Sequence, residues 1–221
     1  MQYLHHKEAG ESTLLLKGDE HRYIFKVRRH REGEVIALRN LEDDNLYSYE
    51  INSLDKKEAS LFLKKSESLI LRAKRKLHIG WCIIDPKSIE RVLPTLNEIG
   101  VERISFIICG RSQKNFRVDI KRLARIILNS SQQCGRSEIM KLELIDSLEK
   151  FLEQNPNAIA LNFSDRFLDG DSNIETIVVG CEGGFTEEEM ALFENNIIGL
   201  DSPLILKSES AVCAVASKIL L

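Results

Sequence analysis

The stretch Thr176-Ile-Val-Val-Gly180-Cys-Glu-Gly183-Gly184-Phe-Thr186-Glu-Glu-Glu189 decides the fold class of this 221-residue chain. Its first part, Ile177-Val178-Val179, has no polar face, which predicts a central strand covered on both sides. Glycines directly after such a strand let the backbone turn sharply and approach a ligand closely. Ligands of open α/β sheets bind outside the carboxyl ends of the strands. The stretch therefore predicts a binding loop at the end of a buried strand.

A second loop follows about twenty residues later, in Pro203-Leu-Ile-Leu206-Lys207-Ser208-Glu209-Ser210-Ala211. We expect a short strand over residues 204–206 and an apolar closing helix over residues 210–221. Either loop alone is equally consistent with an ordinary strand-to-helix turn. Two such loops close together in the sequence favour one shared pocket.

Upstream of these loops, strands and helices alternate from residue 77 onward. An apolar run indicates a buried strand, and apolar residues at helical spacing indicate a helix with one covered face. We expect helix 88–99 to be bent or shortened by Pro94 and capped by Gly100. The alternation predicts a mostly parallel sheet. The expected strands are 77–84, 103–109, 158–163 and 174–179, and the expected helices are 88–99, 119–134 and 187–195.

Residues 1–68 have a different pattern, which predicts a small β-rich domain. Strands are expected over residues 34–38, 46–51 and 59–63, after a short helix or turn over residues 20–29. Several short strands separated by polar turns suggest a barrel. The charged stretch 64–76 is expected to be the linker to the second domain.

Composition limits the possible functions of the chain. Hydrophobic residues make up 43% and charged residues 29%, as in ordinary soluble globular proteins. No run has the length of a membrane span and the start lacks a signal-peptide core, so a cytoplasmic location is expected. The five cysteines are scattered without a Cys-x-x-Cys pair and the histidines are dispersed, which argues against a metal site and against disulfides. Dinucleotide, Walker and serine-hydrolase motifs are absent from the sequence.

Basic residues are clustered although the net charge is only −3. Clusters lie at residues 21–31, 72–76 and 103–125. Local basic patches are the electrostatic mark of RNA binding, whereas any one cluster alone is equally consistent with a solvated surface.

The two C-terminal loops resemble the signature of the small-subunit ribosomal RNA uridine N(3)-methyltransferases, which belong to the knotted SPOUT class. That family has a Gly-Pro-Glu-Gly-Gly-Phe loop and a Leu-Arg-x-Glu-Thr-Ala loop, matched here by residues 180–185 and 206–211. The departures are Cys181 for Pro, Lys207 for Arg and Ser210 for Thr. Lysine keeps the charge of arginine but loses its planar bidentate fork.

Weaker matches extend the resemblance over most of the chain. The family's His-x-x-x-Val-Leu-Arg corresponds to residues 23–29, where Arg29 is kept and Tyr23 replaces His. Glu98-Ile-Gly-Val matches Glu-Leu-Gly-Val, although Glu98 is as consistent with a structural role. Gln132-Gln-Cys-Gly-Arg136 keeps the second glutamine and the arginine of Glu-Gln-x-x-Arg but loses the glutamate.

The resemblance implies a fold and a reaction. It implies a PUA-like β-barrel RNA-binding domain over residues 1–68 and an α/β trefoil-knot methyltransferase domain over residues 72–221. It implies S-adenosylmethionine as cofactor and the N3 atom of a uridine in small-subunit ribosomal RNA, free or in the assembled subunit, as methyl acceptor. Members of the class pair through their knot helices, which implies a homodimer. Neither a metal nor a membrane is implied.

The resemblance also places roles on residues of this chain. A nearby cation would stabilise the developing uracil anion, with Arg111, Arg136 and Lys207 as candidates, and Glu209 would accept the proton. Arg22, Lys26, Arg28 and Arg29 would contact RNA phosphates. The expected cofactor-binding residues are Leu161, Asn162, Gly180, Glu182, Gly183, Gly184, Ile198, Leu200, Leu204, Leu206 and Ser208.

Two other functions stay open at this point. One is a non-catalytic RNA-binding protein that kept the same fold, which the departures at Cys181, Lys207 and Gln132 allow. The other is a SPOUT methyltransferase that modifies a different RNA position. Measuring cofactor binding distinguishes a non-catalytic RNA-binding protein from an enzyme. Mass spectrometry of the RNA distinguishes methylation at another position from methylation at uridine N3.

Overall fold

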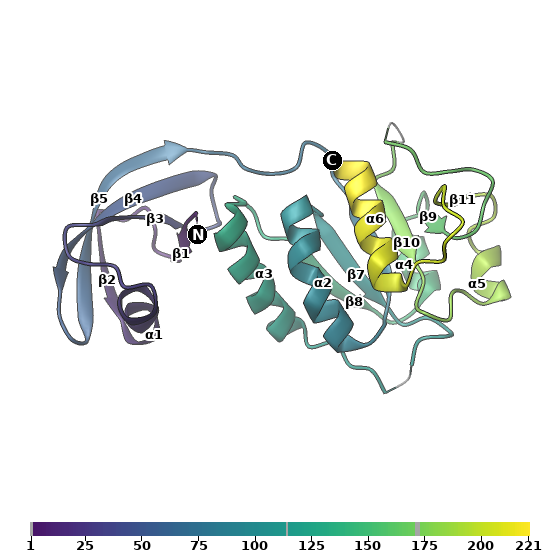
Figure 1. Cartoon of the computed structure of the whole chain (residues 1–221), viewed down its shortest axis with the longest axis horizontal. Coiled ribbons are helices and arrows are strands. Elements are labelled where there is room, and N and C mark those ends of the chain that lie inside the picture. Colours follow the sequence, from purple (N-terminus) through teal and green to yellow (C-terminus); the bar gives the residue numbers. More distant parts are fainter. Residues whose placement is uncertain (1, 114, 171–172) are drawn as a thin grey trace. The chain divides into compact units, whose positions relative to one another are not determined.

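The computed structural model describes residues 2–113, 115–170 and 173–221 and divides the chain into two compact units (Figure 1). The N-terminal unit comprises Met1–Arg72 together with Ser131–Ile139, and the C-terminal unit comprises Ala73–Ser130 and Met140–Leu221. The sequence prediction placed the domain boundary between residues 68 and 72. It did not assign residues 131–139 to the first unit. The main-chain N–H groups of Gln2 and Tyr3 both donate to the carbonyl of Gln132, which ties this segment to the chain start.

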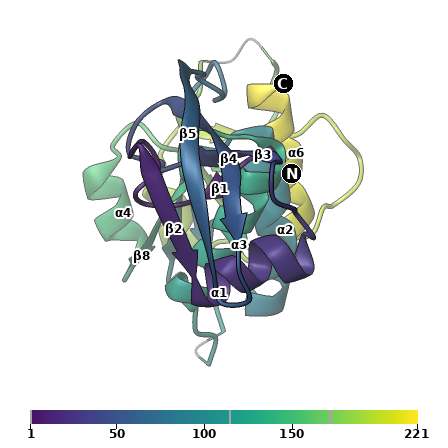
Figure 2. The same ribbon diagram turned by 90° about the vertical axis from the view of Figure 1, so that its left-hand side faces the viewer.

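The N-terminal unit is built on a curled five-stranded sheet (Figure 2). Its strand order is β1-β3-β4-β5-β2, antiparallel apart from the parallel pair of β1 and β3. Alternate residues of the central strands, such as Tyr49, Ile51 and Leu61, are fully buried and form one core. The strands are β1 (Leu4–His5), β2 (Thr13–Lys17), β3 (Val35–Arg39), β4 (Asn45–Leu54) and β5 (Glu58–Ser68).

Two features of this unit refine the sequence prediction. The expected helix or turn before Gly33 is a short helix α1 (Gly18–His21) that continues as a π-helix η1 (Arg22–Val27). The expected linker is wrong at its start, because residues 64–68 complete β5 and pair with β4. Main-chain pairing holds these charged residues in a strand although their side chains are mostly exposed.

The C-terminal unit contains a six-stranded sheet in the order β11-β9-β10-β6-β7-β8. Every pairing is parallel, as expected, so the carboxyl ends of all six strands lie along one edge. The strands are β6 (His78–Cys82), β7 (Arg103–Ile107), β8 (Lys141–Ile145), β9 (Ile159–Leu161), β10 (Thr176–Val179) and β11 (Ile197–Ile198).

Helices cover both faces of this sheet. Trp81 of β6 bonds to Ser208 of α6, whereas a Cβ atom on the neighbouring Gly80 would lie 2.8 Å from the Phe151 ring of α4. Because successive strand residues point to opposite faces, α6 and α4 cover different sides. Figure 1 shows α2 and α3 on the same side as α6. The helices are α2 (Pro86–Ile99), α3 (Ile120–Cys134), α4 (Leu148–Gln154), α5 (Glu187–Ala191) and α6 (Ser208–Leu220).

Several predicted elements of this unit differ from the structure. The sequence did not predict β8 and α4, and it placed a strand at residues 204–206, where the structure has none; the last strand is β11. Pro94 lies inside α2 without ending it, and the helix runs on to a left-handed Gly100 cap at φ 108°. The helix starts as expected, with Pro86 in its first turn and the Asp85 side chain accepting from the Ser88 N–H at 3.2 Å.

One disulfide is present, although the scattered spacing of the cysteines argued against a disulfide framework. Cys82 and Cys109 form a disulfide with their Cα atoms 5.7 Å apart. Cys82 ends β6 and Cys109 lies two residues beyond the end of β7, so adjacent parallel strands bring together two cysteines that are 27 residues apart. The other cysteines, Cys134, Cys181 and Cys213, are free.

Candidate functional site

The residues expected to bind a cofactor gather at the carboxyl ends of three adjacent strands. Leu161 ends β9, Gly180 follows β10 directly and Ile198 ends β11, and β9 lies between the other two strands. The N–H of Asn162 donates to the carbonyl of Ile198 at 3.0 Å. Because the strands are parallel, the loops that leave them start side by side.

The loop after β10 is a tight turn with little side chain in it. The Gly184 N–H donates to the Cys181 carbonyl at 2.9 Å, and Gly184 has a φ of 69° that side chains rarely adopt. Cys181 stands where the resembled family has proline and is buried, and that burial raises the pKa of its thiol. Glu182 is exposed at the tip of the turn.

Ser208 ties this loop to the final helix. Its hydroxyl donates to the Gly180 carbonyl at 2.5 Å and accepts from the Trp81 indole N–H at 2.9 Å. Trp81 is fully buried and Ser208 nearly so. The Ser208 hydroxyl is therefore engaged inside the protein, where it sets the position of Gly180. Trp81 was not among the predicted site residues, and no local motif marks it.

Arg111 joins the same loop from the neighbouring part of the sheet. It lies four residues after the end of β7, and its Nη1 donates to the Gly183 carbonyl at 2.7 Å. A Cβ atom on Gly183 would lie only 3.2 Å from the Cβ of Arg111, so a larger residue at this position would press against the Arg111 side chain. The structure thus brings one expected catalytic residue onto an expected cofactor loop.

Glu189 makes a second link between these loops. One carboxylate oxygen accepts from the Gly110 N–H at 2.7 Å and the other from the Thr186 N–H at 2.9 Å, while the Thr186 hydroxyl caps the Glu189 N–H. This capping box starts α5 and buries the carboxylate. The sequence prediction missed Glu189, although the Thr-x-x-Glu spacing of residues 186–189 was a signal that could have found it.

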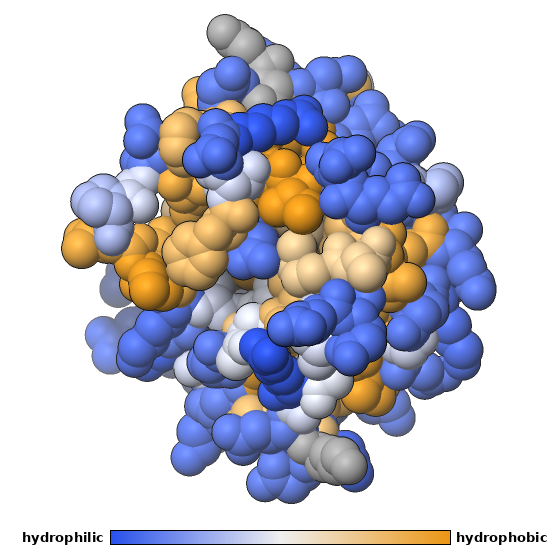
Figure 3. Space-filling model, turned by 90° about the vertical axis from the view of Figure 1, so that its right-hand side faces the viewer, coloured by the Kyte–Doolittle hydropathy of each residue, from blue (hydrophilic) through white to orange (hydrophobic). Residues whose placement is uncertain are grey.

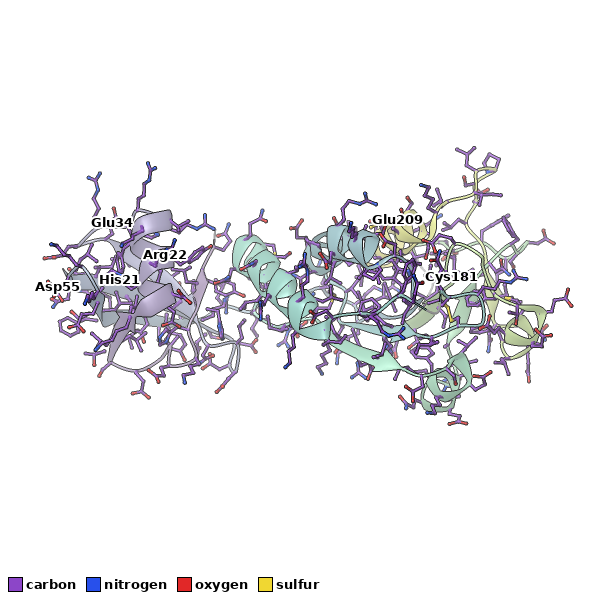
Figure 4. All side chains as sticks on the ribbon, turned by 90° about the horizontal axis from the view of Figure 1, so that it is seen from below. His21, Arg22, Glu34, Asp55, Cys181 and Glu209 are labelled. Carbon is purple, nitrogen blue, oxygen red and sulfur yellow. A yellow bond between two sulfur atoms is a disulfide. The ribbon has the colours of Figure 1, made fainter. Side chains whose placement is uncertain are left out.

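Lys207 and Glu209 flank Ser208 at the start of α6. Lys207 is exposed at the N-cap position. Glu209 lies in the first turn, and an Oε1 atom of its carboxylate is 3.6 Å from Nη2 of Arg91 in α2. Figure 4 labels Glu209 and Cys181 in this unit. A role for Glu209 in accepting a proton would therefore require its carboxylate to act from within an ion pair.

The segment between β11 and α6 is open to solvent. Leu204 is 74% exposed and Ile205 80%, which is unusual for side chains of this kind. Leu206 is 39% exposed, and Leu200 lies earlier in the segment, where its carbonyl accepts from the Ser202 N–H. Figure 3 looks onto the end of this unit where α5 and β11 lie in Figure 1 and shows orange apolar residues gathered there among charged ones.

Arg136 does not belong to the group of residues described above. It lies in the N-terminal unit, with its side chain 5% exposed. Its Nη2 donates to Glu138 at 3.1 Å, and its carbonyl accepts from the Tyr3 hydroxyl at 2.8 Å. These contacts connect it to the start of the chain.

The four residues expected to bind RNA are all exposed and lie on or just after η1. Figure 4 labels Arg22, the first residue of η1. The guanidinium of Arg28 lies 5.3 Å from the Tyr23 ring centre and donates to its hydroxyl at 2.8 Å. Arg29 has a φ of 64°, which redirects the chain after the helix. Lys26 completes a basic, solvent-facing surface that we call the η1 basic surface, consisting of Arg22, Lys26, Arg28 and Arg29.

The described ranges contain neither a metal-binding cluster nor a membrane-spanning helix. No group of three or more His, Cys, Asp or Glu side chains there is arranged to hold a metal ion. None of the helices in those ranges combines the length and apolar character that crossing a bilayer requires.

Known families match both units of the chain. A model of an RNA methyltransferase domain matches residues 72–220, and a model of an RNA methyltransferase PUA domain matches residues 16–64. Ribosomal RNA small subunit methyltransferase E of Helicobacter pylori is 36% identical over 98% of both chains. The protein of the same name from Rickettsia conorii is 26% identical over 97% of this chain and 92% of its own length.

Solved structures share the whole architecture. A ribosomal RNA small subunit methyltransferase E from Neisseria gonorrhoeae, bound to S-adenosyl methionine, has a TM-score of 0.83 at 21% identity and covers 98% of this chain and 95% of its own. A Legionella pneumophila protein in complex with the same cofactor has a TM-score of 0.82 at 22% identity and covers 97% and 94%. The SPOUT fold with an N-terminal PUA-like unit, implied by the resemblance, is confirmed. With both family models matched and a relative 36% identical along nearly its full length, the chain belongs to the RNA methyltransferase family that includes ribosomal RNA small subunit methyltransferase E.

Proposed function

We propose that this protein uses S-adenosylmethionine to methylate the N3 atom of a uridine in small-subunit ribosomal RNA. The observation that carries the proposal is the assembly of the two motif loops at one edge of the sheet, where Ser208 and Arg111 bond to opposite ends of the Gly180–Gly184 turn. Relatives are named ribosomal RNA small subunit methyltransferase E, and one protein of that name was solved with bound S-adenosyl methionine.

The loops suit a neutral adenosine better than a phosphorylated cofactor. Leu204 and Leu206 expose apolar side chains in the second motif loop, and Gly184 of the first loop has open space where a side chain would lie. A backbone turn flanked by apolar groups can bind an uncharged ring through main-chain N–H and C=O groups. S-adenosylmethionine, when bound, supplies the electrophilic methyl group.

The protein's own residues would then control charge and position. Transfer would form a bond between N3 and the methyl carbon while the bond between that carbon and the sulfonium sulfur breaks, leaving a neutral thioether. N3 would also lose its proton, so negative charge would develop on the uracil ring before or during transfer. Arg111 is the best supported cation, because its guanidinium is fixed on the cofactor loop, and Lys207 is the second. Glu209 is proposed to receive the proton. Arg136 stays a candidate whose alanine variant would show whether its buried contacts serve structure or chemistry.

The η1 basic surface is proposed to bind the RNA backbone. Its four exposed basic side chains lie within eight consecutive residues, which suits neighbouring phosphates. Such contacts position RNA but carry little sequence information. Because the proposed substrate is ribosomal RNA, a cytoplasmic location is proposed, with the RNA either free or in the assembled small subunit.

A homodimer is proposed on a different basis from the one expected. The closing helix is not an uncovered apolar face, because Val212, Val215 and Ile219 are buried within the unit. The exposed apolar side chains lie instead at Phe163, Leu204 and Ile205. A patch of this kind on a soluble protein suits a second copy. The trefoil knot stays a prediction from the resemblance.

The decisive experiment has two stages. Calorimetry with S-adenosylmethionine should show one site per chain, and its absence would favour a non-catalytic RNA-binding protein. The protein should then transfer isotope-labelled methyl groups to small-subunit RNA or to assembled subunits isolated from a deletion strain. Nucleoside mass spectrometry should identify N3-methyluridine, and a different methylated nucleoside would show that another RNA position is the target.

A further inference from the structure

A second cavity lies along the same edge of the C-terminal sheet, beside the cofactor loop. Its volume is about 770 Å³, within the range of small-molecule sites. Ile83, Ile108 and Leu144 line it at or near the carboxyl ends of β6, β7 and β8. The expected cofactor residues lie at the ends of β9, β10 and β11, so this cavity was not part of the site described above.

The cavity and the cofactor loop share a wall. Gly110, Thr186 and Glu189 line the cavity, and the carboxylate of Glu189 accepts from the N–H groups of the other two. The next residue after Gly110 is Arg111, whose guanidinium donates a hydrogen bond to the Gly183 carbonyl. One loop thus presents Arg111 to the cofactor turn and, a few residues later, Ser112, Gln113 and Phe116 to the cavity.

The lining suits a flat, uncharged ring. Ile108 is 49% exposed and Leu144 47% exposed, so the floor presents apolar surface to the cavity. Phe116 adds an aromatic face for stacking, and Gln113 and Ser112 add an amide and a hydroxyl that can pair with ring carbonyl and imide groups.

The charges around the cavity exclude a phosphate as the occupant. Glu149 and Glu188 both line it, whereas Arg117 is the one basic side chain among the described residues that do so. A net negative lining repels a phosphodiester and tolerates a neutral base. The sugar-phosphate chain would therefore stay outside the cavity.

We propose that this cavity receives the extruded target pyrimidine, with its ring on Phe116 and the apolar floor. The proposal rests on the proposed function, since N3 is a Watson–Crick edge atom and chemistry there requires an unpaired or flipped base. The shared wall then accounts for how the base and the methyl donor are held next to each other. Gln113 and Ser112 become specificity-determining residues that read the edge of the ring.

Filling the cavity provides the first test. Leu144→Trp should leave S-adenosylmethionine affinity within twofold and RNA affinity within threefold of wild type, while the single-turnover methylation rate falls at least 100-fold. Leu192→Trp is the matched control, because Leu192 is 43% exposed in the same unit and does not line the cavity. The control should retain the wild-type rate. Normal methylation by a folded Leu144→Trp variant would overturn the proposal.

A photocrosslink provides a second test that does not depend on catalysis. Small-subunit RNA transcribed with 5-iodouridine should crosslink to Phe116 in the wild-type full-length protein, and Phe116→Leu should reduce that crosslink at least tenfold. Crosslinks confined to residues outside the cavity would overturn the base site. This test uses the wild-type protein, so it remains decisive if Leu144→Trp fails to fold. If the wild type crosslinks at Phe116 yet transfers no methyl group, the base site stands and the proposed function fails. If the wild type methylates the RNA but forms no crosslink in the cavity, the proposed function stands and the base site fails.

Discussion

Replacing Glu189 with alanine should destabilise the C-terminal unit and loosen the cofactor loop. Its buried carboxylate accepts from two main-chain N–H groups, those of Gly110 at 2.7 Å and Thr186 at 2.9 Å. A hydrogen bond to a charged group contributes about 1.5–3 kcal/mol, and a donor left unsatisfied in the interior adds a similar cost. Removing the buried carboxylate also removes its desolvation penalty, which offsets part of the loss. We expect the free energy of unfolding to fall by about 2–4 kcal/mol.

The assay can use the single tryptophan of the chain as its reporter, because Trp81 is fully buried and bonded to Ser208 near the same loop. Urea unfolding followed by its fluorescence gives the free energy of unfolding, and calorimetry gives S-adenosylmethionine affinity. Glu189→Gln should lie between wild type and Glu189→Ala, since an amide keeps one acceptor oxygen. Glu188→Ala is the control, because it removes an exposed carboxylate from the same helical turn.

The unfolding free energies and cofactor affinities of these variants test whether Glu189 connects the loops. Glu189→Ala should weaken cofactor binding at least tenfold, because Gly110 and Arg111 are no longer fixed against the turn that holds Gly183. If Glu189→Ala is no less stable than Glu188→Ala within about 0.5 kcal/mol, the two hydrogen bonds do not connect the loops.

Four further outcomes are expected. Gly183→Val should abolish S-adenosylmethionine binding measured by calorimetry, because an ideal Cβ at this position would lie 3.2 Å from the Cβ of Arg111 and a branched side chain would push Arg111 off the turn; retained affinity in a folded variant would remove this turn from the site. Ser208→Ala should lower the unfolding free energy in urea by about 2–3 kcal/mol, since it leaves a buried indole N–H and a carbonyl without their shared partner, and a change below 0.5 kcal/mol would contradict that. Burial lowers the pKa of His78 to about 4, so protonation favours the unfolded chain. The free energy of unfolding should therefore fall by about 2 kcal/mol between pH 8 and pH 5, and this fall should be smaller in His78→Asn. The double variant Arg28→Ala with Arg29→Ala should weaken RNA binding and reduce the slope of log affinity against log salt by about two, with cofactor affinity unchanged; the reverse pattern would show that the roles of the two units are wrongly assigned.

The sequence by itself determined the fold class, the alternation of strands and helices that predicts a parallel sheet, and the position of the two motif loops. It could do so because these features depend on local patterns. An apolar run such as Ile177–Val179 marks a buried strand wherever it occurs, and glycines after it mark a sharp turn. Helix α2 was predicted nearly to its ends, because Pro86 and Gly100 are terminal signals carried by single residues.

The partners of the site residues depended on the tertiary structure alone. Ser208 was expected to face a ligand, yet its hydroxyl bonds to Gly180 and Trp81, which lie 28 and 127 residues away in the chain. The Cys82–Cys109 disulfide has the same origin, since neighbouring strands bring together residues without any local signature. The cavity beside the cofactor loop also belongs to this class, because strands from distant parts of the sequence end at one edge of the sheet.

The physical reason for this division is the range of the interactions. Helix caps, turns and apolar periodicity act between residues a few positions apart, so a single sequence records them. Strand order and long-range hydrogen bonds depend on which distant segments pack together, and a polar side chain such as Glu189 carries no mark of the partner it will find. The sequence thus determined where the loops begin, and only the folded chain decided that Arg111, Glu189 and Ser208 hold them in place.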